Sequence, residues 1–180
     1  MRQIVCAVLV SLAAGVTGAE TLWVGGTAGW SWDWKPATRV SDNFANNQRV
    51  GAGLALGLPI DSDTTVRFQI ADLPHDLGTP GGTVARGVLR GYTVGVDYGL
   101  QGGFGSAFVA GGLGAYDARV DAPYNTGDYA RMKFGWYVGI GEWFPVTKHV
   151  RGVIELDVHK TQHSDRPTIF SAVTGLAYSF

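Results

Sequence analysis

The residues best suited to chemistry stand close together near the end of the chain: His159, Thr161, His163 and Ser164. A histidine activates a hydroxyl nucleophile by accepting its proton. In an extended strand, residues two apart share a face and adjacent residues lie on opposite faces. His159 could therefore accept the proton of the Thr161 hydroxyl, whereas the side chains of His163 and Ser164 would point to opposite faces. The alternative is that these histidines bond to loop groups at the rim and do no chemistry.

Two carboxylates precede this cluster, because Glu155 and Asp157 share one face of the same segment. Paired carboxylates occur in glycosidases and at metal sites, but a buried ion-pair network is simpler, since unpaired buried charges are costly. We expect such a network inside the fold, made by Arg49, Arg67, Gln69, Asp97, Arg151, Glu155, Asp157 and His159. No phosphate-binding loop, HExxH motif or Cys/His ligand spacing occurs, so neither a cofactor nor a metal is expected.

The segments that carry these residues alternate apolar and polar positions in runs that end in turn-forming residues. The runs match the length that a tilted strand needs to cross a bilayer, about 9–11 residues. We predict strands at residues 21–32, 48–60, 64–72, 88–100, 107–117, 132–144, 150–163 and 168–180. The phase of 107–117 stays unassigned, because Val109 and Leu113 oppose Phe108 and Tyr116.

Short and long connections alternate along the chain. Residues 61–63, 101–105 and 147–149 form short turns, whereas 33–47, 73–87 and 118–131 are longer and polar, and the last connection, 164–167, is compact. An up-and-down barrel places alternate connections at opposite ends, with short periplasmic turns and longer external loops. The predicted fold is an all-β, eight-stranded antiparallel up-and-down transmembrane barrel.

Composition favours a membrane barrel over a soluble calyx. The chain has 180 residues, a formal net charge of −1, 16% charged residues and 27 glycines, so no basic surface for nucleic acid is implied. A solvated outer face would carry more lysine and glutamate, whereas glycine and a few charges of both signs suit a narrow, filled lumen. Aromatic residues near the run ends would form interfacial girdles: Trp30, Trp32, Tyr92, Tyr98, Trp136 and Phe144.

The N-terminus has the layout of a cleavable export signal. Arg2 precedes an apolar run from Ile4 to Ala14, and small residues lead to a cleavage site between Ala19 and Glu20. The run is too short for a comfortable transmembrane helix, which needs about 20 apolar residues. Residues 1–19 are therefore predicted to be a signal peptide and 20–180 the barrel. Cys6 would leave with the signal, so the mature chain would have no cysteine.

The C-terminal segment from Gly175 to Phe180 resembles the closing strand of bacterial outer-membrane barrels, which typically ends in aromatic-x-Phe. The stretch from Gly135 to Gly141 is similar to the sixth strand of OmpA/OmpX-type small barrels. The resemblance implies that the barrel-assembly machinery reads Tyr178 and Phe180. Glu142 departs from the family, which usually has an apolar, lipid-facing residue there, so either a bulge shifts the phase or Glu142 lies among the headgroups. No periplasmic domain is expected after Phe180.

Some eight-stranded outer-membrane barrels are lipid A deacylases with a His-x-Ser-Asn motif on a late strand. Here Thr161 follows His159 at that spacing, and the motif is not reproduced. The predicted phase also points His159, Thr161 and His163 into the lumen, whereas a deacylase must reach lipid outside.

We therefore expect a monomeric, non-enzymatic protein of a Gram-negative outer membrane, with a structural or surface-interaction role carried by its external loops. A narrow, porin-like pore for small solutes and a lipid A-modifying enzyme are the alternatives. Expected partners are outer-membrane lipid, lipopolysaccharide and the assembly machinery. Arg86 and Arg90 could meet lipopolysaccharide phosphates or be solvated rim charges. The external loops carry Trp34, Asn43, Asn46, Asn47, Pro123, Tyr124 and Asn125.

Overall fold

The computed structural model describes residues 22–33, 49–78, 84–100, 106–120, 131–163 and 168–180. The predicted signal peptide, 1–19, lies outside the described residues. Within them, no helix is long and apolar enough to span a membrane. The regular structure consists of eight strands: β1 (Trp23–Asp33), β2 (Arg49–Pro59), β3 (Thr64–Gly78), β4 (Val84–Gly99), β5 (Ser106–Val120), β6 (Lys133–Pro145), β7 (Val150–Thr161) and β8 (Thr168–Ser179).

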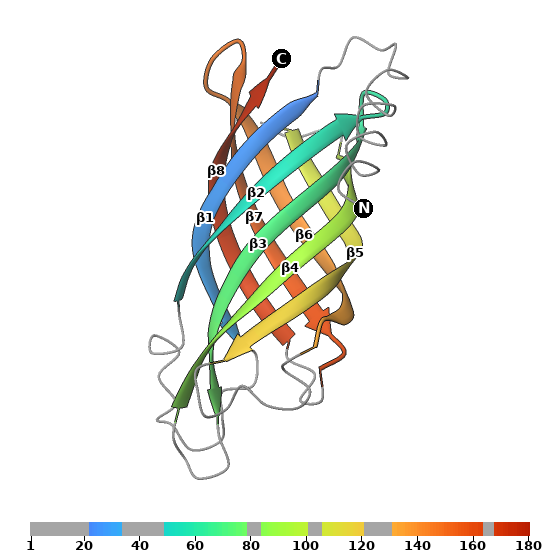
Figure 1. Cartoon of the computed structure of the whole chain (residues 1–180). Coiled ribbons are helices and arrows are strands. Elements are labelled where there is room, and N and C mark those ends of the chain that lie inside the picture. Colours follow the sequence, from blue (N-terminus) through green and yellow to red (C-terminus); the bar gives the residue numbers. More distant parts are fainter. Residues whose placement is uncertain (1–21, 34–48, 79–83, 101–105, 121–130, 164–167) are drawn as a thin grey trace.

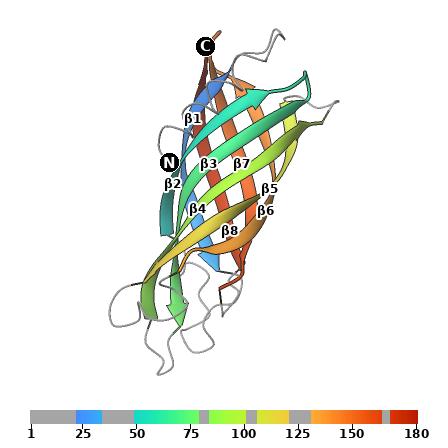
Figure 2. The same ribbon diagram turned by 45° about the vertical axis from the view of Figure 1, so that its right-hand side comes forward.

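Each strand pairs antiparallel with its neighbours in sequence, and β8 pairs with β1, which closes the barrel (Figures 1 and 2). Paired residues followed once around the wall from Trp23 lead through Arg67 and Tyr137 to Asp33, ten positions further along β1. This stagger requires tilted strands, typically by about 35–45° in barrels. The predicted eight-stranded up-and-down barrel is confirmed.

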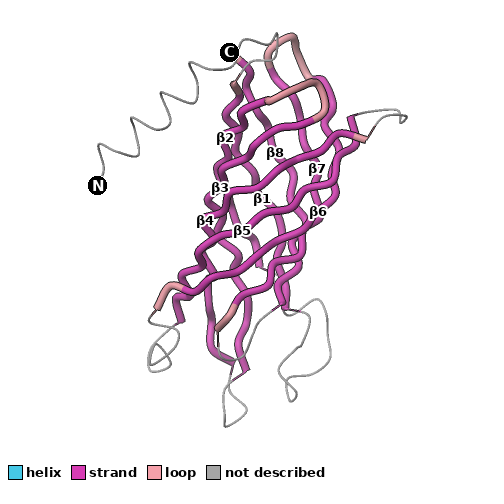
Figure 3. The backbone as a smooth tube through the Cα atoms, turned by 90° about the vertical axis from the view of Figure 1, so that its right-hand side faces the viewer, coloured by secondary structure: helices cyan, strands magenta, loops and turns pink. Residues whose placement is uncertain are grey.

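The hairpin of β3 and β4 is longer than the sequence predicted. We expected a loop over 73–87, but the two strands pair from Thr64↔Tyr98 to Gly78↔Val84. Pro74 is tolerated in this extension because β2 pairs with β3 only as far as Ala71, so among the described residues no strand pairs with this edge of β3 beyond that point. Figure 3 shows these strands running past their neighbours at the end opposite the C-terminus.

The described turns at residues 60–63 and 146–149 and the C-terminal residues share one end of the barrel. Trp23, at the start of β1, pairs with Ser179 at the end of β8 and with Gly57 of β2, close to the turn at 60–63. In that turn the Asp61 carboxylate accepts hydrogen bonds from the backbone N–H groups of Asp63 (2.9 Å) and Thr64 (2.7 Å). These bonds lower the pKa of the Asp61 carboxyl. We call this end the short-turn end and the other the loop end.

The direction of the alternation is as predicted. The apolar side chains of Leu54, Val94 and Leu156 lie on the outer wall, 67%, 47% and 51% exposed, whereas Arg67 and Glu155 are 3% and 1% exposed inside. A wall of this kind suits lipid and not water.

The structure also settles two positions that the sequence left open. In β5, Phe108 and Tyr116 point inward and are buried, and Leu113 points outward. Glu142 pairs in regular register with Ala107 and Ile154, so no bulge shifts the phase there. The Glu142 side chain is exposed on the outer wall near the end of β6 at the short-turn end. This position fits the headgroup zone.

Candidate functional site

The interior of the barrel is filled where the side chains of one strand meet glycines of the next. A Cβ atom on Gly57 would lie 2.0 Å from the Trp23 ring, and one on Gly112 would lie 2.5 Å from the Tyr137 ring. Gly135 makes the same space for Tyr116, at 2.6 Å. The glycine-rich faces seen in the sequence are therefore seats for aromatic rings, which explains their density in a narrow lumen.

A buried ion-pair network lies at the middle of the lumen. Arg67 donates from Nη1 and Nη2 to the two carboxylate oxygens of Glu155, at 2.7 and 2.5 Å. Its Nε lies 3.3 Å from Oδ1 of Asp97, and its guanidinium carbon lies 5.7 Å from the centre of the Tyr137 ring. The bidentate arrangement is the strong geometry for such a pair and fixes both side chains. Residues of β3, β4, β6 and β7 are thus tied together across the interior.

The next layer toward the loop end is held by hydrogen bonds and ring stacking among tyrosine, histidine, serine and aspartate side chains. The Tyr116 hydroxyl and Nδ1 of His159 are hydrogen-bonded at 3.1 Å, and the His159 ring stacks on Tyr137 with centroids 5.6 Å apart. Ser171 donates to Oδ2 of Asp157 at 3.3 Å. Gln69 is buried beside this layer, where it lines a small void with Asp157 and His159.

The predicted pairing of His159 with Thr161 is not observed. The Thr161 hydroxyl is instead hydrogen-bonded to Nδ1 of His163 at 2.9 Å, while His159 bonds to Tyr116. His163 lies two residues beyond Thr161, past the end of β7. All three side chains are buried inside the barrel, at most 2% exposed. Ser164 lies outside the described residues.

An apolar cluster occupies the lumen toward the loop end. It consists of buried side chains from β3, β4, β5 and β8: Leu73, Leu89, Tyr116, Ala118 and Ile169. The most exposed of them is Ala118, at 5%. We call this cluster the apolar plug, because it stands between the polar layers and the loop end.

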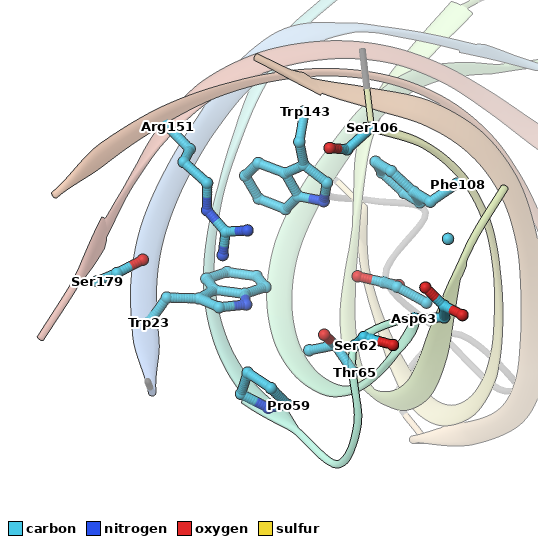
Figure 4. A pocket seen from close by; sticks show the side chains of 12 residues that line it. Trp23, Pro59, Ser62, Asp63, Thr65, Ser106, Phe108, Trp143, Arg151 and Ser179 are labelled. Carbon is cyan, nitrogen blue, oxygen red and sulfur yellow. The ribbon is translucent and has the colours of Figure 1, made fainter. Parts of the chain in front are cut away.

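A cavity of about 410 Å³ occupies the lumen at the short-turn end (Figure 4). The indole rings of Trp23 and Trp143 meet edge to face with centroids 5.1 Å apart, and Phe108 stacks on Trp143 at 5.9 Å. The Arg151 guanidinium lies over the Trp143 ring, 5.1 Å from its centre. Asp97 reaches the cavity from the ion-pair network. The lumen therefore has a cavity at the short-turn end and is filled by side chains from its middle toward the loop end.

Some of the remaining predicted residues lie on the outer wall, and the side chains of the others lie outside the described parts of the structure. On the wall, the side chains of Trp30, Tyr92, Tyr98, Trp136, Phe144, Tyr178 and Phe180 are exposed, and Trp32 stacks on Phe170 at 5.9 Å. Arg90 also points outward and donates to both Asp72 oxygens, at 2.6 and 2.7 Å. The side chains of Arg49 and Arg86, the cleavage site at Ala19 and Glu20, and the predicted loop residues lie outside the described parts.

Sequence reasoning missed the aromatic residues of the lumen. Trp23, Tyr116, Tyr137 and Trp143 point inward, although the prediction assigned aromatic residues mainly to the membrane girdles. The available clue was their position on the glycine-rich face of each run, where Trp23 and Tyr137 stand among glycines.

Comparison with solved structures identifies the fold. Neisserial surface protein A is 14% identical with a TM-score of 0.64, over 91% of this chain and 99% of that one. The N-terminal barrel domain of Pseudomonas aeruginosa OprF is 16% identical with a TM-score of 0.56, over 88% and 97% of the two chains. The chain has the fold of a small outer-membrane β-barrel.

A third outer-membrane barrel, Ail from Yersinia pestis in complex with the heparin analogue sucrose octasulfate, is 14% identical with a TM-score of 0.52, over 89% and 97% of the two chains. No family model and no curated protein matches the sequence. The similarity of the chain to these outer-membrane barrels is therefore one of fold, with little similarity of sequence.

Proposed function

We propose that the chain is a non-enzymatic barrel of the bacterial outer membrane that is closed to solutes and acts in the envelope or at the cell surface through its external loops. The observation that carries this proposal is the filling of the lumen at two levels. The Arg67–Glu155 pair crosses its middle, and the apolar plug follows toward the loop end. A rigid, closed scaffold leaves its ends as the places for interaction.

Four further features support this function. His159 and Thr161 are buried in the lumen and face away from the lipid that a deacylase would need to reach. Ail, which shares the fold, was crystallised with a sulfated sugar, an example of ligand binding by such a barrel. Arg90 stands on the outer wall, where it could meet lipopolysaccharide phosphates. Tyr178 and Phe180, exposed beside the short-turn end, are suited to recognition by the assembly machinery.

The narrow pore is the second candidate, and the cavity at the short-turn end is the observation that favours it. Conduction would require a continuous path past the Arg67–Glu155 pair and the apolar plug, and the burial of these side chains supports a closed lumen. The closed barrel and the narrow pore therefore differ in one measurable property, the conductance of ions across a bilayer.

Conductance in planar bilayers tests the proposal. We expect no discrete channel openings from the purified barrel, after heat-dependent gel mobility has verified that it is folded. The double variant Tyr116→Ala/Tyr137→Ala removes two rings from the lumen and is the positive control, because it should admit water and ions. Channel openings in the unmodified protein would favour the pore and contradict the closed barrel.

A further inference from the structure

The cavity at the short-turn end has the size of a binding site. Its volume of about 410 Å³ falls in the range of small-molecule pockets, about 300–1,000 Å³. It is lined from both the barrel wall and the turn at 60–63, where Ser62 and Asp63 stand at its edge. In outer-membrane barrels this end faces the periplasm. A small molecule could therefore enter without passing the plug.

One carboxylate of the cavity wall, that of Asp97, is held by an ion pair with Arg67 and accepts no hydrogen bond within the described residues. Asp97 is 4% exposed, and neither of its carboxylate oxygens accepts a hydrogen bond from the described residues. The nearest cation, Arg67, lies 3.3 Å from Oδ1 through Nε, but both of its terminal nitrogens donate to Glu155. A buried carboxylate that accepts no hydrogen bond is costly, so donors among the contents of the cavity, water or a bound molecule, would stabilise Asp97.

The charges around the cavity disfavour a charged occupant. The guanidinium groups of Arg67 and Arg151 already lie over Phe108 and Trp143, at 5.9 and 5.1 Å, so an added cation would meet rings that already face cations. An anion would lie against Asp97 and Asp63. A neutral molecule avoids both conflicts.

The remaining lining suits hydroxyl groups and a flat apolar face. Ser62, Thr65, Ser106 and Ser179 contribute hydroxyls around the cavity (Figure 4). The indole of Trp143 and the ring of Phe108 offer rigid apolar surface against which C–H groups can pack. Hydroxyls that donate to a carboxylate form charge-assisted bonds, which are stronger than neutral ones.

We propose that this cavity binds a neutral polyhydroxylated molecule of monosaccharide size, with its hydroxyls donating to Asp97 and its C–H face against the aromatic wall that Trp143 forms. The occupant enters from the short-turn end. This site is separate from the external loops and from the question of conduction.

Indole N–H resonances of the folded barrel in detergent micelles test the site, with glucose, glucosamine and glucuronate as probes. These three share one ring and differ in charge. We expect glucose to shift the Trp143 and Trp23 signals saturably, with a Kd of the order of millimolar. Trp136, on the outer wall, is the internal reference and should not move. No saturable shift with glucose, tighter binding of either charged sugar, or an equal shift of Trp136 would overturn the proposal.

Paired leucine substitutions locate the binding. A Cβ atom on Gly99 would lie 3.5 Å from its nearest neighbour, an ordinary contact distance, and Gly99 lines the cavity, so we expect Gly99→Leu to place its side chain there. Gly26→Leu adds the same side chain on the outer wall, where the nearest atom to a Cβ is 3.8 Å away. We expect Gly99→Leu to abolish the glucose shift and Gly26→Leu to preserve it.

Two further variants keep the test decisive. Asp97→Asn, which keeps the shape of the side chain, should weaken binding about tenfold because it removes the charged acceptor. If Gly99→Leu does not fold, Ser106→Trp blocks the cavity at its exposed edge instead. Glucose binding that is unchanged in the folded blocking variant would refute the assignment of the cavity.

Discussion

Tyr137 lies against the backbone of β4 and β5, where Gly95 and Gly112 leave room for its ring. A Cβ on Gly112 would lie 2.4 Å from the backbone oxygen of Val94 and 2.5 Å from the Tyr137 ring. Backbone cannot move aside cheaply in a closed barrel, because every strand is paired on both sides. Glycine at such positions is a packing requirement and not a source of flexibility.

Neighbouring glycines on opposite faces of β5 provide a direct test. Gly112→Ala should lower the free energy of unfolding by about 1–3 kcal/mol, the usual cost of overpacking. Gly111→Ala is the control, because its Cβ would face outward with the nearest atom 3.7 Å away. Urea-induced unfolding in lipid vesicles measures both. Equal stabilities of the two variants would show that the lumen is looser than described.

The Arg67–Glu155 pair should be costly to break and much less costly to replace. Glu155→Ala leaves a buried guanidinium whose remaining ion pair among the described residues is with Asp97, and we expect a loss of about 3–5 kcal/mol in unfolding free energy. The triple variant Arg67→Met/Glu155→Leu/Asp97→Leu removes all three charges of the network and should recover most of that loss. A triple variant as unstable as Glu155→Ala would mean that the charges are not mutually compensating.

At the residue scale, the sequence predicted which side chains face inward but not how they pair. Alternation assigns Arg67, Glu155 and His159 to one face. Partners, in contrast, depend on the stagger between strands that are distant in sequence, such as β3 and β7. The bond between Thr161 and His163 could not be predicted either, because His163 lies beyond the end of β7 and the strand rule no longer applies.

Single strands alternate between two environments, and β4 shows this most simply. Thr93, Gly95 and Asp97 are buried inside, while Val94 and Val96 are exposed on the outer wall between Tyr92 and Tyr98. The two tyrosines mark the ends of an apolar stretch, as interfacial aromatic residues do in membrane barrels.

A lysine scan along the outer face of β4 should therefore depend on depth. Val94→Lys is expected to reduce the free energy of unfolding in lipid by about 2–4 kcal/mol, and Leu100→Lys, just beyond the strand, by about 0–1 kcal/mol. Equilibrium unfolding in vesicles measures the difference. If Val94→Lys is tolerated as well as Leu100→Lys, the outer face of β4 does not contact the hydrocarbon.

Strand number and order followed from the sequence, but strand length did so only in part. Seven of the predicted strands had clear alternation of apolar and polar residues. The eight strands pair in the order of the sequence, as an up-and-down barrel requires. The loop-end parts of β3 and β4 were not predicted as strand, because Pro74 and the glycines after it are typical of a loop. Proline is acceptable at position 74 because the β2–β3 pairing ends at Ala71. The phase of β5 required the closed barrel, since both of its faces carry large apolar residues.

The whole molecule resembles a small protein core enclosed by a wall that faces lipid. The ion-pair network lies inside with aromatic rings and the apolar plug, and aliphatic residues such as Leu54, Val94 and Leu156 cover the outer wall. Closure of β8 on β1 leaves no unpaired edge along most of the barrel, which a bilayer demands because its interior offers no hydrogen bonds.

Nuclear Overhauser effects between lipid acyl chains and protein methyl groups test this arrangement most directly, on the unmodified barrel in lipid nanodiscs. We predict cross-peaks from acyl methylenes to the methyls of Leu54, Val94 and Leu156. The methyls of Leu89 and Val153, 1% and 2% exposed inside the barrel, should show none. Cross-peaks to Leu89 and Val153 with none to the outer three would mean that the apolar faces point inward, and would contradict the account.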